Sequence, residues 1–131
     1  MRRIRTTAGL FTAAMIATVA SQAPADAGAR AKPVSCYGYT TPSIGSFLLE
    51  TRWDDGSEEC FTISPTRRIL HTWPNSGGWY EMPGNGRADD VVNAWETNGD
   101  RTVEVDVVGS SSNWCNTNPV GSASWGSWRR C

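Results

Sequence analysis

The chain has 131 residues, a formal net charge of −1, four cysteines, seven tryptophans and one histidine. A chain of this length forms a single small domain. Its charge balance gives no electrostatic attraction to nucleic acid or to an anionic membrane surface, so both are excluded as expected partners.

The N-terminal segment has the three parts of a secretory signal peptide. Residues 1–5 are cationic, residues 8–20 are apolar, and residues 25–27 are the small-residue sequence Ala-Asp-Ala. The apolar stretch is too short to span a bilayer core permanently. We expect cleavage after residue 27, with residue 25 as an alternative, and a secreted protein.

All four cysteines follow the predicted cleavage site, where an oxidising extracellular setting allows disulfides. An even number of cysteines in a small exported domain predicts two disulfides, for which three pairings exist. Short loops close more readily than long ones, which favours pairing Cys36 with Cys60 and Cys115 with Cys131.

Past a flexible tail predicted over residues 28–35, one β domain is expected over residues 36–131. Short runs of aromatic and branched residues alternate there with turns rich in Gly, Pro, Asn and Asp. An Asp-Gly turn at residues 54–57 predicts the first hairpin. The predicted strands, in chain order, are 47–53, 60–63, 67–73, 79–82, 90–96 and 101–108.

The clearest strand covers residues 101–108. Val103, Val105 and Val107 alternate with acidic residues, so one face is expected in the core and the other in water. Residues 97–100 connect this strand to the preceding one as a hairpin. Several short strands without a helical period predict an all-β fold, a small disulfide-stapled β-sandwich or barrel with long Gly- and Pro-rich loops.

The seven tryptophans fall into two groups. Trp53, Trp73 and Trp95 lie within predicted strands and are expected to be structural. The other four have Gly, Ser or Asn neighbours, a setting that suits either the core or exposed stacking on sugar rings and protein partners. These four are Trp79, Trp114, Trp125 and Trp128.

The longest irregular stretch, residues 71–90, combines aromatic rings with hydrogen-bonding side chains. Loops held on a rigid β scaffold are common binding sites, although the glycines and prolines here also suit simple turns. The predicted binding residues are Trp79, Tyr80, Glu81, Asn85, Arg87, Trp125 and Trp128.

Catalysis and metal binding have weak support in the sequence. His71 has no GxSxG sequence to accompany it, and a lone histidine on a strand is expected to be structural. Glu81 with Asp89 or Asp90 offers a carboxylate pair for glycoside hydrolysis. Oxygen ligands for calcium occur at 85–90 and 54–59, without EF-hand spacing. We expect no enzymatic activity, no cofactor and no metal.

Residues 51–65, TRWDDGSEECFTISP, resemble the strand–turn–strand of small secreted α-amylase inhibitors of the tendamistat type. The resemblance implies a secreted inhibitor with an all-β fold and two disulfides. The family's Trp-Arg-Tyr triplet is absent, since Arg130 follows Trp128 and Arg129, and the cysteine spacing differs. No residue role is therefore taken from the resemblance.

These features predict a small secreted, non-catalytic binding protein that recognises extracellular carbohydrate through exposed Trp and Tyr side chains. The alternatives are a secreted inhibitor that presents residues 74–90 to an amylase or protease, and a small extracellular toxin. The expected partner is an extracellular glycan or a secreted protein, bound by a monomer. No membrane association is expected after cleavage of the signal peptide.

Overall fold

The computed structural model describes residues 31–44 and 48–131. Within these residues the chain forms ten strands and no helix, which confirms the predicted all-β fold. The predicted signal peptide lies outside the described residues. In the described part of the chain, no helix has the length and apolar character needed to cross a bilayer.

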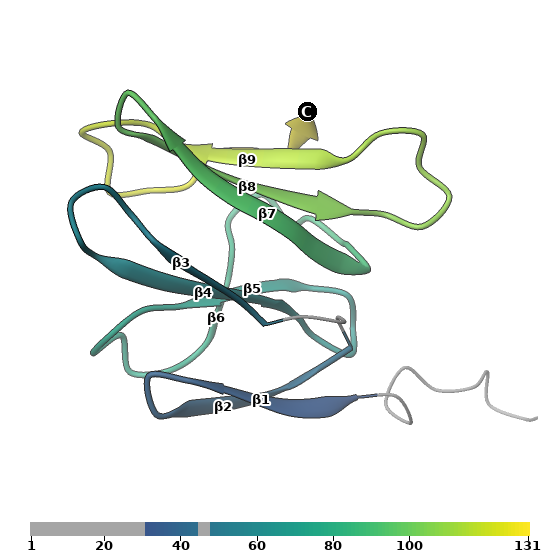
Figure 1. Ribbon diagram of the computed structural model, residues 1–131. Helices are drawn as coiled ribbons and strands as arrows, with labels where there is room; N and C mark the ends of the chain where they lie inside the picture. Colours follow the sequence, from purple (N-terminus) through teal and green to yellow (C-terminus); the bar gives the residue numbers. More distant parts are fainter. Residues whose placement is uncertain (1–30, 45–47) are drawn as a thin grey trace, which may run out of the picture.

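The strands form three layers, visible one above another in Figure 1. The outermost layer is a hairpin of β1 (Lys32–Cys36) and β2 (Tyr39–Ser43). The first sheet contains, in spatial order, β3 (Leu49–Arg52), β4 (Glu58–Ile63), β5 (Ile69–Thr72) and β6 (Tyr80–Glu81). The second sheet contains β7 (Asp90–Thr97), β8 (Asp100–Asp106), β9 (Trp114–Asn118) and β10 (Arg129–Arg130), again in spatial order. The two sheets face each other as a β-sandwich.

Both predicted hairpins are present. In the β3–β4 turn, the backbone N–H of Trp53 donates to the carbonyl of Ser57 at 2.8 Å. In the β7–β8 turn, Asn98 and Gly99 have φ values of 52° and 86°. Two-residue hairpin turns need positive φ at both central positions, and Asn-Gly is the pair that best tolerates it. The residue types at the two turns therefore account for both hairpin connections.

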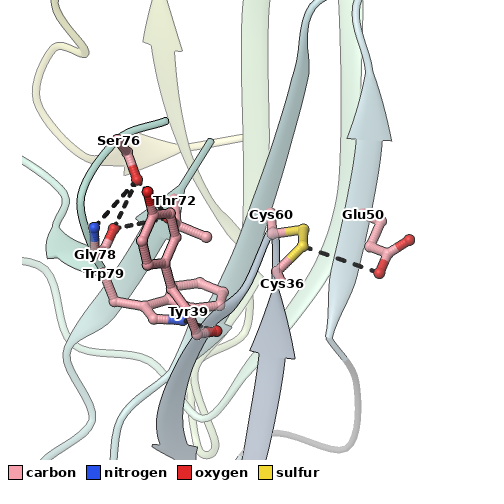
Figure 2. Close-up of a disulfide and its surroundings, with 8 residues drawn as sticks. All are labelled: Cys36, Tyr39, Glu50, Cys60, Thr72, Ser76, Gly78 and Trp79. Carbon is pink, nitrogen blue, oxygen red and sulfur yellow. Dashed lines mark hydrogen bonds between the residues drawn. A yellow bond between two sulfur atoms is a disulfide. The ribbon is translucent and has the colours of Figure 1, made fainter. Parts of the chain in front are cut away.

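The flexible tail predicted over residues 28–35 is wrong for residues 32–35, which belong to β1. This strand pairs with β2 in antiparallel register, from Cys36 opposite Tyr39 to Lys32 opposite Ser43. The Cys36–Cys60 disulfide attaches the hairpin to β4 (Figure 2), and Nε1 of Trp79, just before β6, donates to the carbonyl of Tyr39. Backbone pairing and this cross-link order a segment whose side chains carry little strand signal.

The two disulfides have the pairing that the short loops favoured, Cys36–Cys60 and Cys115–Cys131. The first joins the outer hairpin to β4, and the second joins β9 to the last residue of the chain. Cys36, Cys60 and Cys115 are buried. Two such cross-links fit an oxidising compartment.

The hydrophobic core fills the space between the two sheets. Phe61 and Ile63 project from β4, and Val103 and Val105 project from β8, with all four side chains buried as the period of two predicts. Trp125 packs edge-on against Phe61, with ring centroids 5.7 Å apart.

A β-bulge in β7 decides the orientation of Trp95. The register of β7 against β8 shifts between Val91 and Asn93. An extra residue reverses the alternation of side chains, so Val91 points into the core whereas Trp95, four residues later, is 36% exposed. The prediction of a structural, strand-buried Trp95 is wrong for this reason.

An ion pair at the other end of the sandwich links the sheets. Nε of Arg67 lies 2.9 Å from Oδ1 of Asp89, and the N–H of Val108 donates to Oδ2 at 2.7 Å. The hydrogen bonds from Arg67 lower the pKa of Asp89, and the bond from Val108 lowers it further. Partial burial acts in the opposite direction but does not cancel this effect. A lowered folded-state pKa stabilises the fold at pH values above the ordinary aspartate pKa of about 3.9. This stabilisation is lost as the pH falls through the folded-state pKa.

We therefore expect Asp89→Asn to destabilise the protein at about pH 7 and to cost progressively less towards about pH 3. Urea unfolding of the wild type and the variant across this range measures the difference. Val108→Ala, which keeps the backbone N–H, is the matched control and should show no such convergence. A gap between wild type and Asp89→Asn that stays constant with pH would contradict the assignment.

Candidate functional site

A cleft of about 600 Å³ enters between the two sheets at one end of the sandwich. The turns of the β3–β4 and β7–β8 hairpins lie at this end, on the left in Figure 1. Its walls include Trp53, His71 and Arg101, and its inner end reaches the core at Trp125. We call it the inter-sheet cleft. Its volume falls within the range of roughly 300–1,000 Å³ typical of small-molecule sites.

A buried carboxylate–imidazole pair lies on the first-sheet wall of the inter-sheet cleft. Glu59 on β4 and His71 on β5 are 6% and 8% exposed, and Oε1 of Glu59 lies 2.7 Å from Nδ1 of His71. Nε1 of Trp53 donates to the other carboxylate oxygen at 3.1 Å. Because a carboxylate accepts hydrogen bonds, this pairing assigns a proton to Nδ1.

The Nε2 atom of His71 has no hydrogen-bond partner among the described residues. The ring itself is fixed, since it stacks on Phe61 with an interplanar angle of 18° and lies 5.1 Å from the Trp73 ring. The imidazole therefore presents one oriented hydrogen-bonding atom at the wall of the cleft.

Arg101 on β8 provides the opposite wall. Its Nη2 donates to Oδ2 of Asp55 at 2.7 Å and to Oγ of Ser57 at 3.1 Å. Its guanidinium carbon lies 5.1 Å from the centroid of the Trp53 ring, within cation–π range. Hydrogen bonds from Ser57, with Arg101 adding to them, lower the pKa of Asp55. The arginine is held in place by partners from the β3–β4 turn.

The charged side chains that line the inter-sheet cleft balance without a contribution from His71. Arg52 and Arg101 offset Glu58 and Glu59. Arg52 and Glu58 are direct cross-strand partners. Such a lining offers hydrogen-bonding groups without a surplus of either sign, so it suits a neutral polar ligand better than an ion.

An aromatic pair continues the first-sheet wall beyond the cleft. Trp73 is 39% exposed and Tyr80 is 45% exposed, with ring centroids 5.7 Å apart and planes inclined by 31°. The prediction of a structural, strand-buried Trp73 is wrong, because the residue lies just past the end of β5, where the wall is open. Tyr80 is the one predicted binding residue that joins this aromatic surface.

The other predicted binding residues of the 71–90 segment bond mainly within that segment. Glu81 forms ion pairs with Arg68 and Arg87, at 3.4 and 3.1 Å. Arg87 also donates to the carbonyl of Asn85 at 3.3 Å, and Asn85 itself has a φ of 53° in a turn. Nε1 of Trp79 donates to the carbonyl of Tyr39 at 3.0 Å and ties the segment to the outer hairpin. These contacts stabilise the loop.

The C-terminal tryptophans are packing residues. Trp125 takes the core position, one of the two settings expected for it, and it also lines the inter-sheet cleft. Trp128 covers Gly86, where an added Cβ would lie 2.6 Å from its Nε1. Trp114 and Trp128 line a second cavity of about 280 Å³ near Ile69. The predicted set is therefore not gathered at one site.

The carboxylate groups considered for catalysis or calcium are also dispersed. Glu81 and Asp89 are paired with different arginines. Within residues 31–44 and 48–131, the cluster of possible metal ligands comprises Cys36, Glu50 and Cys60. Its two sulfurs form a disulfide, with Oε1 of Glu50 4.0 Å from Sγ of Cys36 (Figure 2).

Sequence reasoning missed Glu59 and Arg101 as site residues, although a signal for both is present. Glu59 lies at the same strand period of two as Phe61 and Ile63, and Arg101 lies at the same period as Val103 and Val105. Each charged residue therefore shares a face of its strand with apolar residues. A charged residue on the apolar face of an alternating strand is expected to point towards the core. His71 stands in the same relation to Ile69.

Comparison of the chain with family models, with curated protein sequences and with solved structures finds no match.

Proposed function

We propose that this is a small secreted, non-catalytic protein that binds extracellular carbohydrate in the inter-sheet cleft. The observation that carries the proposal is the continuity of the charge-matched cleft with the exposed Trp73–Tyr80 pair. Sugars present hydroxyl groups at their edges and apolar C–H faces, so they need both kinds of surface. Aromatic side chains supply the apolar contact, and a few placed polar groups orient the ligand.

The roles within the site follow from the geometry. Trp73 offers its exposed ring face to a sugar ring, and Nε2 of His71 accepts a hydrogen bond from a sugar hydroxyl. Glu59 holds the imidazole in orientation through the 2.7 Å contact with Nδ1. The signal peptide predicted over residues 1–27 and the two disulfides support an extracellular place of action.

Trp73→Ala is expected to weaken glycan binding about tenfold, which corresponds to about 1.4 kcal/mol, because a stacking surface is lost. Affinity electrophoresis in gels that contain amylose, xylan or laminarin identifies a binding glycan, and isothermal titration then gives the affinity. Trp95→Ala removes a tryptophan of similar exposure on β7, outside the cleft, and should leave binding unchanged. Equal losses in the two variants, or no retardation in any of the gels, would contradict the proposal.

A second candidate is a protein inhibitor that presents residues 74–90 to a secreted hydrolase. The supporting observation is the internal bonding of this segment, in which Glu81 and Arg87 form an ion pair and Tyr80 Oη donates to the carbonyl of Ser76 at 2.7 Å. A pre-ordered loop loses little conformational entropy on binding. Stoichiometric inhibition of a secreted amylase or protease would favour this function over carbohydrate binding.

A further inference from the structure

The inter-sheet cleft is closed on the side where β3 approaches β7. The backbone N–H of Asp54 donates to Oε2 of Glu96 at 2.8 Å and joins the β3–β4 turn to the second sheet. The Arg101–Asp55 ion pair makes another such link beside it. These contacts connect the two sheets and bound the cleft on this side.

The inner end of the cleft is closed by aromatic packing. The rings of Trp53 and Trp125 have centroids 6.2 Å apart, and both contact Phe61 in edge-on arrangements. All three side chains are buried and belong to the hydrophobic core. A ligand that enters the cleft therefore stops at this layer.

The first-sheet wall of the cleft continues towards the edge strand β6. Tyr80 is the direct cross-strand partner of His71, and such partners project from the same face of a sheet. The first-sheet wall thus runs from Glu59 and His71 to the exposed rings of Trp73 and Tyr80. Polar groups occupy the closed part of this wall, and stacking surfaces occupy its open part.

We infer that the cleft binds the end of a glycan chain, with the terminal sugar beside His71 and the following sugars leaving over Trp73 and Tyr80. This inference rests on the proposed carbohydrate binding and adds the part of the glycan that is recognised. A cleft closed on the β3–β7 side and at its inner end admits a chain terminus, whereas binding in the middle of a chain needs two exits.

The test compares each glycan before and after cleavage by an endo-acting glycosidase, with amylose, xylan and laminarin as probes. Isothermal titration gives the number of protein-binding sites per gram of glycan. Recognition of chain ends predicts that this number rises in proportion to the new ends. An unchanged or smaller number with retained binding overturns the inference and leaves carbohydrate binding intact. No binding to either form of any probe contradicts the proposed function and the inference together.

Variants along the wall give a second readout. Tyr80→Ala should weaken binding of a tetrasaccharide roughly threefold to tenfold more than binding of the matching disaccharide, because its ring meets only the later sugars. His71→Gln should weaken both oligosaccharides by similar factors. Trp95→Ala is the matched control for an exposed aromatic outside the wall. Equal losses for the two lengths in Tyr80→Ala overturn the assigned direction of the chain.

Discussion

Replacing His71 with alanine is expected to lower the free energy of unfolding by about 3–5 kcal/mol. The change removes the partner of a carboxylate that is 6% exposed and leaves Glu59 with the Trp53 indole N–H as its hydrogen-bond donor. Breaking a buried pair on one side costs more than the pair contributes, because the remaining charge stays desolvated. Urea unfolding at neutral pH measures the loss.

The paired replacement Glu59→Met with His71→Phe is the control for this prediction. Two apolar side chains of similar volume leave no uncompensated group, so most of the stability should return. The phenyl ring can occupy the stacking position of the imidazole on Phe61. Glycan binding should be lost in this stable protein. If the double variant were no more stable than His71→Ala, the loss would come from packing instead of the unpaired carboxylate.

Removing the Cys36–Cys60 disulfide by the double replacement Cys36→Ser and Cys60→Ser is expected to cost about 3 kcal/mol. The cross-link closes a loop with a sequence separation of 24, and its loss enlarges the conformational freedom of the unfolded chain. It also leaves the β1–β2 hairpin held by hydrogen bonds that include those of Trp79, Gly77 and Ser43. Equilibrium unfolding in urea measures the change.

The matched control replaces Cys115 and Cys131, which close a loop with a separation of 16. A similar loss is expected there, since the loop entropy depends only weakly on length. Amide hydrogen exchange separates the two variants, because only the first should lose protection in β1 and β2. A cost below about 1 kcal/mol for the first variant would mean that noncovalent contacts alone hold the hairpin.

Much of the fold was predictable because local signals and the global arrangement agree. The Asp-Gly turn at residues 54–57 and the Asn-Gly turn at residues 98–99 each fix a hairpin, and the valines of β8 identify the core face. The pairing of the cysteines follows from loop length. The strand β1 was missed because its order comes from a partner strand and a cross-link, which its own side chains do not reveal.

The site was harder to predict because exposure depends on which strands end first. Trp73 lies in a run typical of a strand, yet its exposure follows from the end of β5 at the cleft. Trp95 is turned outward by a bulge that no residue type in β7 announces. Trp125 has small polar neighbours typical of a loop but fills the core. Neighbouring residue types alone do not determine how a second sheet covers the first.

The two covalently closed loops meet at a pair of indoles. Trp53 lies between Cys36 and Cys60, and Trp125 lies between Cys115 and Cys131, yet their ring centroids are 6.2 Å apart. The chain between the loops, which supplies most of the core, carries no cross-link. Contacts between residues far apart in sequence slow folding. The contact between Trp53 and Trp125 closes a long stretch of chain, and oxidation of the cysteines does not shorten this stretch.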